Sequence, residues 1–262
     1  MSTGKNSLEN KCERLRALHV RGAPLLLPNA WDAASARAVV AAGFPVVATT
    51  SAGVAAALGH ADHEHAPRDE MLAAAARIAA SVDVPVTIDA EAGYGLSPAG
   101  LVAELSRVGA AGCNLEDTDH AAGKLRDPKK HAAWLREVRA AAKDQGYGLV
   151  VNARIDVFLA THEKGGQGGL VAEALERARL YFEAGADCVY PITLWEKGPL
   201  NEFVAAAPGP VNILPMPRGP TVAELTAAGV ARISFASRLH REVMEHLRQR
   251  LAAIAEATGA AG

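Results

Sequence analysis

Asp89 and Glu91 stand one residue apart at the end of a short run of β-branched residues, Val86–Ile88. Branched side chains favour a buried strand, so the two carboxylates are predicted to lie at the end of a strand. Gly93 and Gly95 then let the backbone turn sharply and pass close to a bound group. A carboxylate buried there needs a hydrogen-bond donor or a cation, and Mg2+ binds carboxylate oxygens while keeping several waters. The pattern therefore indicates a magnesium site, with an ordinary turn or helix cap as the alternative.

Polar side chains also follow three other predicted strands. They are Thr50 and Ser51 at the end of Val46–Thr50, Glu116 and Asp117 at the end of Gly112–Asp117, and Arg154 and Asp156 at the end of Leu149–Ile155. An arginine among carboxylates can bind a substrate carboxylate through two parallel hydrogen bonds, so the set indicates an anionic substrate held by a cation. Two plainer interpretations remain open: Glu116 pairs with Arg154 across the site, and Asp156 holds Arg154 instead of touching substrate.

Eight short apolar stretches, most of them followed by a helical pattern, must position these residues. They are Pro24–Pro28, Val46–Thr50, Val86–Asp89, Gly112–Asp117, Leu149–Ile155, Asp187–Ile192, Val211–Leu214 and Ala231–Phe235. Near-continuous apolar strands that alternate with helices are typical of a parallel sheet covered on both faces. We therefore predict an α/β fold, a (β/α)8 TIM barrel in a single domain over 1–262, with the barrel proper at about 24–240. A doubly wound sheet is the alternative, but no GxGxxG follows the first strand.

Two helices are expected outside the barrel proper, an N-terminal one at Ser7–Val20 and a long C-terminal one at 237–258. The C-terminal helix carries apolar residues at helical spacing: Leu239, Met244, Leu247, Leu251 and Ile254. Such a stripe packs on the chain's own barrel or on a neighbour's, and we expect the first arrangement. Gly165–Gly169 is predicted to be a flexible insertion between the fifth strand and the next helix.

Composition excludes several classes of protein. A net charge of −2 gives no basis for binding nucleic acid or an anionic membrane, and no apolar run is long enough for a membrane span. The polar N-terminus is no signal peptide, and three scattered cysteines form neither a disulfide framework nor a zinc site, so a reducing cytoplasm is expected. His60, His63 and His65 beside Asp62 raise the alternative of zinc, but the nearby carboxylates favour Mg2+.

Several motifs, in this order, resemble the isocitrate lyase/phosphoenolpyruvate mutase superfamily. They are Pro28-Asn29-Ala30-Trp31-Asp32, Thr50-Ser51, Leu58-Gly59-His60-Ala61-Asp62, the stretch from Asp89 to Gly95, Leu115-Glu116-Asp117 and Asn152-Ala153-Arg154. The resemblance extends from about Leu25 to Arg238. It implies an α/β barrel, Mg2+ (or Mn2+) as cofactor, and a 2-oxo acid substrate in which a C–C or P–C bond next to an enolpyruvate is made or broken. It also implies a homo-oligomer, a dimer or a tetramer, in which the C-terminal helix is exchanged between subunits.

The same resemblance assigns roles to individual residues. Asp89 matches the direct metal ligand, and Asp62, Glu91 and Glu116 match carboxylates that hold metal-bound waters. Thr50, Ser51 and Ala52 match the segment that holds the substrate carboxylate, with Arg154 on its other side. These roles agree with the chemistry, because a chelated cation stabilises the negative charge that develops on the 2-oxo oxygen as the bond breaks.

The chain also departs from the superfamily's lyases and mutases. The loop Thr118–Pro128 has no cysteine, Cys113 lies inside a strand, Ile192 follows Pro191 where the lyases tend to have glutamate, and the mutase's asparagine-bearing loop is not evident. Cleavage of isocitrate or methylisocitrate and phosphoenolpyruvate mutase activity are therefore not expected. His120 and Lys124 are the loop groups that could move protons, unless they are simply solvated, and Tyr94 is predicted to line the pocket.

We therefore expect a Mg2+-dependent lyase that breaks a C–C bond in a small 2-oxo or 2-hydroxy carboxylic acid, by decarboxylation or retro-aldol cleavage, through a pyruvate-type enolate. A hydrolase of a phosphonopyruvate-type P–C bond is one alternative. A 2-oxo acid binding protein without catalysis is another, because the loop cysteine is missing. A Schiff-base aldolase is not expected, because no lysine ends a predicted strand.

Overall fold

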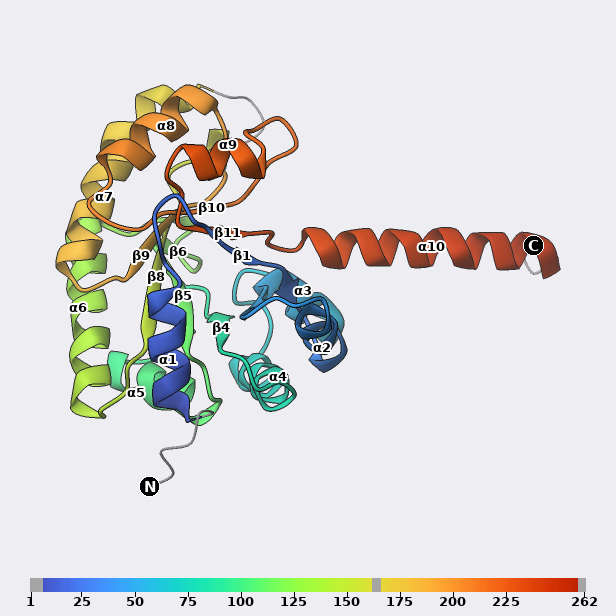
Figure 1. Ribbon diagram of the computed structural model, residues 1–262. Helices are drawn as coiled ribbons and strands as arrows, with labels where there is room; N and C mark the ends of the chain where they lie inside the picture. The colour runs from blue at the N-terminus through green and yellow to red at the C-terminus, as the bar shows by residue number, and fades with distance from the viewer. Residues whose placement is uncertain (1–6, 162–165, 259–262) are drawn as a thin grey trace.

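Eight parallel strand positions form a closed ring in the computed structural model, which describes residues 7–161 and 166–258. In chain order they are β1 (Leu25–Leu27) continued by β2 (Asn29–Ala30), β3 (Val47–Thr49), β4 (Val86–Asp89), β5 (Gly112–Glu116), β8 (Val150–Ile155), β9 (Cys188–Pro191), β10 (Asn212–Ile213) and β11 (Arg232–Ser234). One sheet runs from β2 to β9, a second joins β10, β11 and β1, and a parallel bridge between Val189 and Val211 connects them. The predicted barrel is confirmed, and the open doubly wound sheet is excluded (Figure 1).

Helices cover the outside of this ring. They are α2 (Ala33–Ala41), α4 (Arg68–Ala80), α5 (Pro98–Arg107), α6 (Pro128–Asp144), α7 (Val171–Glu183), α8 (Lys197–Ala206) and α9 (Val222–Ala227). Asp32 caps α2 by accepting from Ser35 N, and Ser97 caps α5 ahead of Pro98. Such caps satisfy backbone N–H groups that the first turn leaves unpaired, and both starts agree with the sequence pattern.

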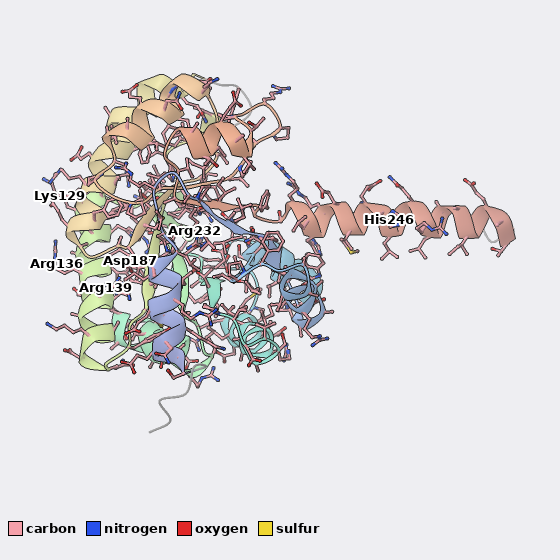
Figure 2. The ribbon with its side chains drawn as sticks, viewed as in Figure 1. Lys129, Arg136, Arg139, Asp187, Arg232 and His246 are labelled. Atoms are coloured by element: carbon pink, nitrogen blue, oxygen red, sulfur yellow. The ribbon has the colours of Figure 1, made fainter. Side chains whose placement is uncertain are left out.

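A short helix packs near the N-terminal ends of the strands. This is α1 (Leu8–Ala17), which buries Cys12 and Leu15. Its Arg16 donates to the carbonyl oxygens of Gly148 and Leu149, just before β8, and pairs with Asp187, just before β9. Arg139 of α6 also pairs with Asp187 (Figure 2). In barrels of this kind the chemistry sits at the opposite, C-terminal ends of the strands.

Two elements at those C-terminal ends were not predicted from the sequence. Helix α3 (Ser51–Leu58) follows β3 directly and ends at Gly59, which has φ 86°. A two-stranded antiparallel hairpin, β6 (Thr118–Asp119) with β7 (Lys124–Leu125), follows β5. Two short 3-10 helices, η1 (Leu159–Thr161) and η2 (Gln167–Leu170), lie between β8 and α7, and Gly165 of the predicted insertion lies outside the described residues.

The C-terminal helix α10 (Arg238–Thr258) extends away from the barrel (Figure 1). None of its residues is buried, and Val243, Leu247, Leu251 and Ile254 are each 44–54 % exposed. Side chains such as His246 point outward from it on every side (Figure 2). The helix bounds agree with the prediction, but the expected packing of its apolar stripe on the chain's own barrel was wrong. No helix among the described residues has the length and hydropathy that a membrane span requires.

Candidate active site

Asp89 lies at the C-terminal end of β4, and the neighbouring strand β3 and helix α3 fix its orientation. Its backbone N donates to Thr49 Oγ1 at 2.9 Å, and its Oδ2 accepts from Ser51 N at 3.1 Å. Ser51 is the first residue of α3, so a helix N-terminus with its unpaired N–H groups faces this carboxylate. The other oxygen, Oδ1, is buried and has no hydrogen-bond partner in the described part of the chain. One oxygen of Asp89 is therefore held and the other is available to a ligand.

Two further carboxylates lie close to Asp89. Glu91 is 3 % exposed, and its Oε1 accepts from Glu64 N at 2.7 Å. Burial, together with the negative charges of Asp89, Asp62 and Glu116, raises the pKa of Glu91 to about 8, although the Glu64 N–H opposes this. Asp62 Oδ1 is buried and unpartnered within the described residues. Crowded carboxylates of this kind repel one another until a cation binds between them.

Glu64 also belongs to this group, and sequence reasoning missed it. Its backbone N holds Glu91, and its Oε1 accepts from Tyr94 N at 2.7 Å. Both Glu64 and His63 have positive φ values, 58° and 68°, so the loop is tightly turned where it meets the end of β4. The only sequence signal for Glu64 was its position two residues after Asp62.

Arg154 stands between two carboxylates. Its Nε and Nη2 donate to the two oxygens of Asp156 at 2.6 and 3.0 Å, and its Nη1 contacts Glu116 Oε2. Both plainer interpretations from the sequence are therefore observed: Asp156 holds Arg154, and Glu116 pairs with it. The role of Arg154 toward a substrate carboxylate remains a prediction. The guanidinium lies at the site in a fixed orientation, which a bidentate contact requires.

Two groups that can carry protons approach the carboxylates. His120, in the turn of the β6–β7 hairpin, makes a short contact from Nε2 to Glu116 Oε1, and this hydrogen bond raises the pKa of the imidazole above its usual value. Tyr94 O–H donates to Asp89 O at 3.4 Å. Burial, and the charge of Glu91 after it, raise the pKa of the Tyr94 phenol well above 10, so the hydroxyl keeps its proton at neutral pH.

Lys124 and the three loop histidines do not join this group. The backbone of Lys124 pairs with that of Asp119 in the hairpin and the residue lines a separate cavity, so its role in proton transfer remains a prediction. His60 Nε2 lies 3.3 Å from Glu70, His65 Nδ1 lies 2.6 Å from Asp62 O, and the ring of His63 lies 5.3 Å from that of His120. The three imidazoles therefore have different neighbours and do not form the zinc site considered as an alternative.

The residues present fit a hard cation that keeps most of its waters. Within residues 7–161 and 166–258, no three carboxylate, imidazole or thiol groups are close enough to hold a metal directly. Asp89 Oδ1 and Asp62 Oδ1 are nevertheless both buried and have no hydrogen-bond partner among those residues. Mg2+ commonly binds through one or two carboxylates and several waters, so one direct ligand with water-holding carboxylates around it suits that ion.

Comparison with known proteins shows the family to which the chain belongs. Residues 15–255 match the family described as phosphoenolpyruvate phosphomutase. The chain belongs to this family. It is also 38 % identical to an uncharacterized protein of Mycobacterium tuberculosis over 221 residues, which cover 84 % of this chain and 80 % of that protein. The family is part of the isocitrate lyase/phosphoenolpyruvate mutase superfamily, as the motifs indicated.

This member of the phosphomutase family also resembles a lyase in sequence and a solved structure in fold. The 2-methylisocitrate lyase of Escherichia coli is 30 % identical over 257 residues, covering 92 % of this chain and 84 % of the lyase. A crystal structure from Burkholderia cenocepacia, assigned to the phosphonomutases, superposes with a TM-score of 0.89 at 40 % identity and covers 94 % of this chain and 99 % of that one. The protein is thus an enzyme of a superfamily of carbon–carbon lyases and mutases.

Proposed function

We propose that this enzyme is a Mg2+-dependent lyase that breaks a C–C bond of a small 2-oxo or 2-hydroxy carboxylic acid, by decarboxylation or retro-aldol cleavage. The observation that carries the proposal is Asp89, whose Oδ2 is held by the N–H of Ser51 while its buried Oδ1 has no partner among the described residues. Mg2+ (or Mn2+) bound there would supply a Lewis acid that stabilises negative charge on the substrate's oxygens. Glu91, Glu116 and Asp62 would hold the waters of that ion.

The start of α3 is proposed to bind the substrate carboxylate. Thr50 is the N-cap of this helix and makes no side-chain capping hydrogen bond, and Ser51 and Ala52 are the first two helical residues, of which Ser51 holds Asp89 through its N–H. Unpaired N–H groups and the positive end of the helix dipole favour an anion at this place. Arg154, held in the site by Asp156 and Glu116, would fix the other side of the same carboxylate.

His120 and Tyr94 are proposed to manage the protons. When the C–C bond breaks, its electron pair remains on the carbon next to the 2-oxo group, and that carbon must receive a proton to give the 2-oxo acid product. His120 is held by Glu116, and this hydrogen bond raises the pKa of the imidazole, which favours the protonated form that can donate. The Tyr94 hydroxyl, which keeps its own proton, would donate a hydrogen bond to developing negative charge.

Turnover assays of an Asp89→Asn variant test this function. The panel should contain oxaloacetate, 2-hydroxy diacids and phosphonopyruvate, with Mg2+ and with a chelator. Asp89→Asn is expected to lower kcat by about 100-fold or more, comparable to the loss of a preorganised donor. Asp144→Asn, an exposed position near the end of α6, serves as the control and should match the unchanged enzyme.

Three results would contradict the proposal. Undiminished metal-dependent turnover by Asp89→Asn would remove the assigned ligand. Tight calorimetric binding of 2-oxo acids without any product over the whole panel would favour the non-catalytic binding protein. Release of inorganic phosphate from phosphonopyruvate alone would redirect the chemistry to P–C hydrolysis, which the similarity to a structure assigned to the phosphonomutases supports.

We also propose that the enzyme is a homo-oligomer that exchanges α10. The apolar stripe of α10 is exposed, and an apolar groove of about 660 Å³ lies at its base. The groove is lined by residues of α2, α10 and the segments beside them, among them Trp31, Phe44, Phe235 and Leu239. The α10 of a second copy, with the same stripe, would cover such a surface.

Three buried cysteines without disulfides support a reducing cytoplasm as the site of action.

A further inference from the structure

A second cavity, of about 760 Å³, lies on the outer side of the β6–β7 hairpin. Its walls come from four parts of the chain: the turn after β4, the hairpin, the first turns of α6, and α7. None of the proposed metal ligands and none of the residues proposed to hold the substrate carboxylate lines it. The cavity has the size of a site for a small metabolite.

Cationic side chains from three elements line this cavity. Lys124 and Arg126 come from the hairpin, Lys130 from α6 and Arg177 from α7. Arg177 is neutralised by Asp117 and Glu173, but the other three form no ion pair among the described residues.

The carboxylates of the lining compensate these charges only in part, because two acidic residues face three cations that have no ion pair within the described part of the chain. The two acidic residues of the lining, Asp119 and Asp127, accept from the backbone N–H groups of Ala122 and Lys130. The lining therefore carries an excess of positive charge, which attracts an anion.

A tryptophan and a histidine form part of the lining. The guanidinium of Arg126 lies 5.8 Å from the centre of the Trp134 ring, whose other neighbour is the imidazole of His131 at 5.7 Å. His131 is only 1 % exposed, and both of its ring nitrogens lack a hydrogen-bond partner within the described residues. Buried polar groups are rarely left unpaired, so the imidazole lacks a partner that a bound oxyanion can supply.

The hairpin connects this cavity to the proposed active site. Its turn carries His120, which contacts Glu116, and Thr118 Oγ1 donates to Asp156, which holds Arg154. On the cavity side, Arg126 N donates to Asp117 O at 2.7 Å. A ligand that holds Lys124 and Arg126 would therefore restrict the same hairpin that positions His120.

From these contacts we propose that the cavity is an effector site for a small metabolite bearing phosphate or carboxylate groups. The anion binds between Lys124, Arg126 and Lys130, gives the His131 imidazole N–H an acceptor, and holds the hairpin in place over the active site. The anion site itself is independent of the proposed reaction; only its effect on turnover rests on the proposed function.

Calorimetric titration of the full chain, without Mg2+, tests the site. Inorganic pyrophosphate and tricarballylate are the two ligands, so that the two arms separate a phosphate from a carboxylate preference. Lys130→Glu is the decisive variant and Lys129→Glu its matched control, because both residues lie exposed in the first turn of α6 and only Lys130 lines the cavity (Figure 2 labels Lys129). Lys130→Glu should weaken the preferred ligand at least tenfold and Lys129→Glu less than about twofold.

Asp89→Asn separates this site from the active site, since binding of the effector anion should remain unchanged in that variant. Hydrogen exchange of the amides at 118–125 should slow when the anion is bound. Three results would overturn the proposal: no saturable binding of either anion up to about 10 mM, equal weakening by both lysine variants, or loss of binding in Asp89→Asn. Failure of the proposed reaction with intact anion binding would leave the effector site standing.

Discussion

Arg154 shows how one side chain can satisfy two carboxylates and still be placed for substrate. It is 8 % exposed and contacts Asp156 through two nitrogens and Glu116 through a third. Lysine keeps the charge but has a single ammonium group, so it cannot reproduce the planar, bidentate contact. Arg154→Lys is therefore expected to raise KM for carboxylate substrates at least about tenfold, with a smaller change in kcat.

The control for this prediction is Arg136→Lys, on the exposed face of α6 (Figure 2). Steady-state kinetics at several Mg2+ concentrations distinguish a substrate effect from a metal effect. An unchanged KM in Arg154→Lys would show that the guanidinium serves only the two carboxylates.

His131 links the pH dependence of stability to a single buried ring. Burial, followed by the nearby cations Arg126 and Arg177, lowers the pKa of His131 to about 3, whereas an unfolded chain has a His pKa of about 6.5. Between these values the unfolded state binds the proton and the folded state does not, so the free energy of unfolding falls as pH falls through this window. The contribution is about 2 kcal/mol between pH 6.5 and pH 5.

Urea unfolding at pH 7.5 and pH 5 measures this contribution. His131→Phe keeps an aromatic ring beside Trp134 and Tyr181 and should lose about 2 kcal/mol less than the unchanged enzyme on acidification. His246→Phe, exposed on α10, should keep the full loss. Identical pH slopes in all three proteins would contradict the assignment.

At the scale of elements, the turn after β4 depends on two glycines that differ in their surroundings. Both have positive φ, 94° at Gly93 and 66° at Gly95. A Cβ at Gly93 would lie 2.9 Å from Trp134 Cζ2, whereas a Cβ at Gly95 would have no neighbour within 4 Å. Alanine at either position costs about 1–2 kcal/mol for the left-handed backbone, and at Gly93 the clash adds about 1–3 kcal/mol.

Gly93→Ala and Gly95→Ala therefore form a matched pair. Denaturant midpoints should fall further for Gly93→Ala. Only this variant should lose activity, because displacing the turn also displaces Glu91, which precedes Gly93 by two residues. Equal losses of stability would show that backbone strain alone limits this turn.

At the scale of the whole molecule, α10 is the element whose apolar stripe is exposed along the helix. Leu247 is 44 % exposed in the middle of the apolar stripe, and Gln249 lies on the opposite face. If a second copy covers the stripe, Leu247→Lys buries an unpaired charge and should shift the protein toward monomers, whereas Gln249→Lys should not. Light scattering over a concentration series measures the proportions of monomer and oligomer. If the enzyme without substitutions is a monomer, the proposed exchange is contradicted.

The sequence by itself determined the barrel and the residues at its C-terminal rim. The three strands that carry Asp89, Glu116 and Arg154 are short, largely apolar runs with polar residues at their ends, so the positions of these residues follow from local patterns. Closing the strands into a parallel barrel then brings those ends together without further information. The caps at Asp32 and Ser97 are equally local, because each satisfies N–H groups within three residues.

Only the tertiary structure decided what depends on distant surfaces. Helix α3 is made largely of small residues without a clear apolar stripe. Its N-terminus joins the site through the hydrogen bond from Ser51 N to Asp89 Oδ2, and these two residues lie 38 positions apart in the sequence. The outward position of Lys124 follows from hairpin pairing, and Glu64 joins the site through backbone contacts. An amphipathic pattern shows that α10 has a face to bury, but periodicity carries no information about which surface covers it, because that depends on the shape and apolar area of the partner.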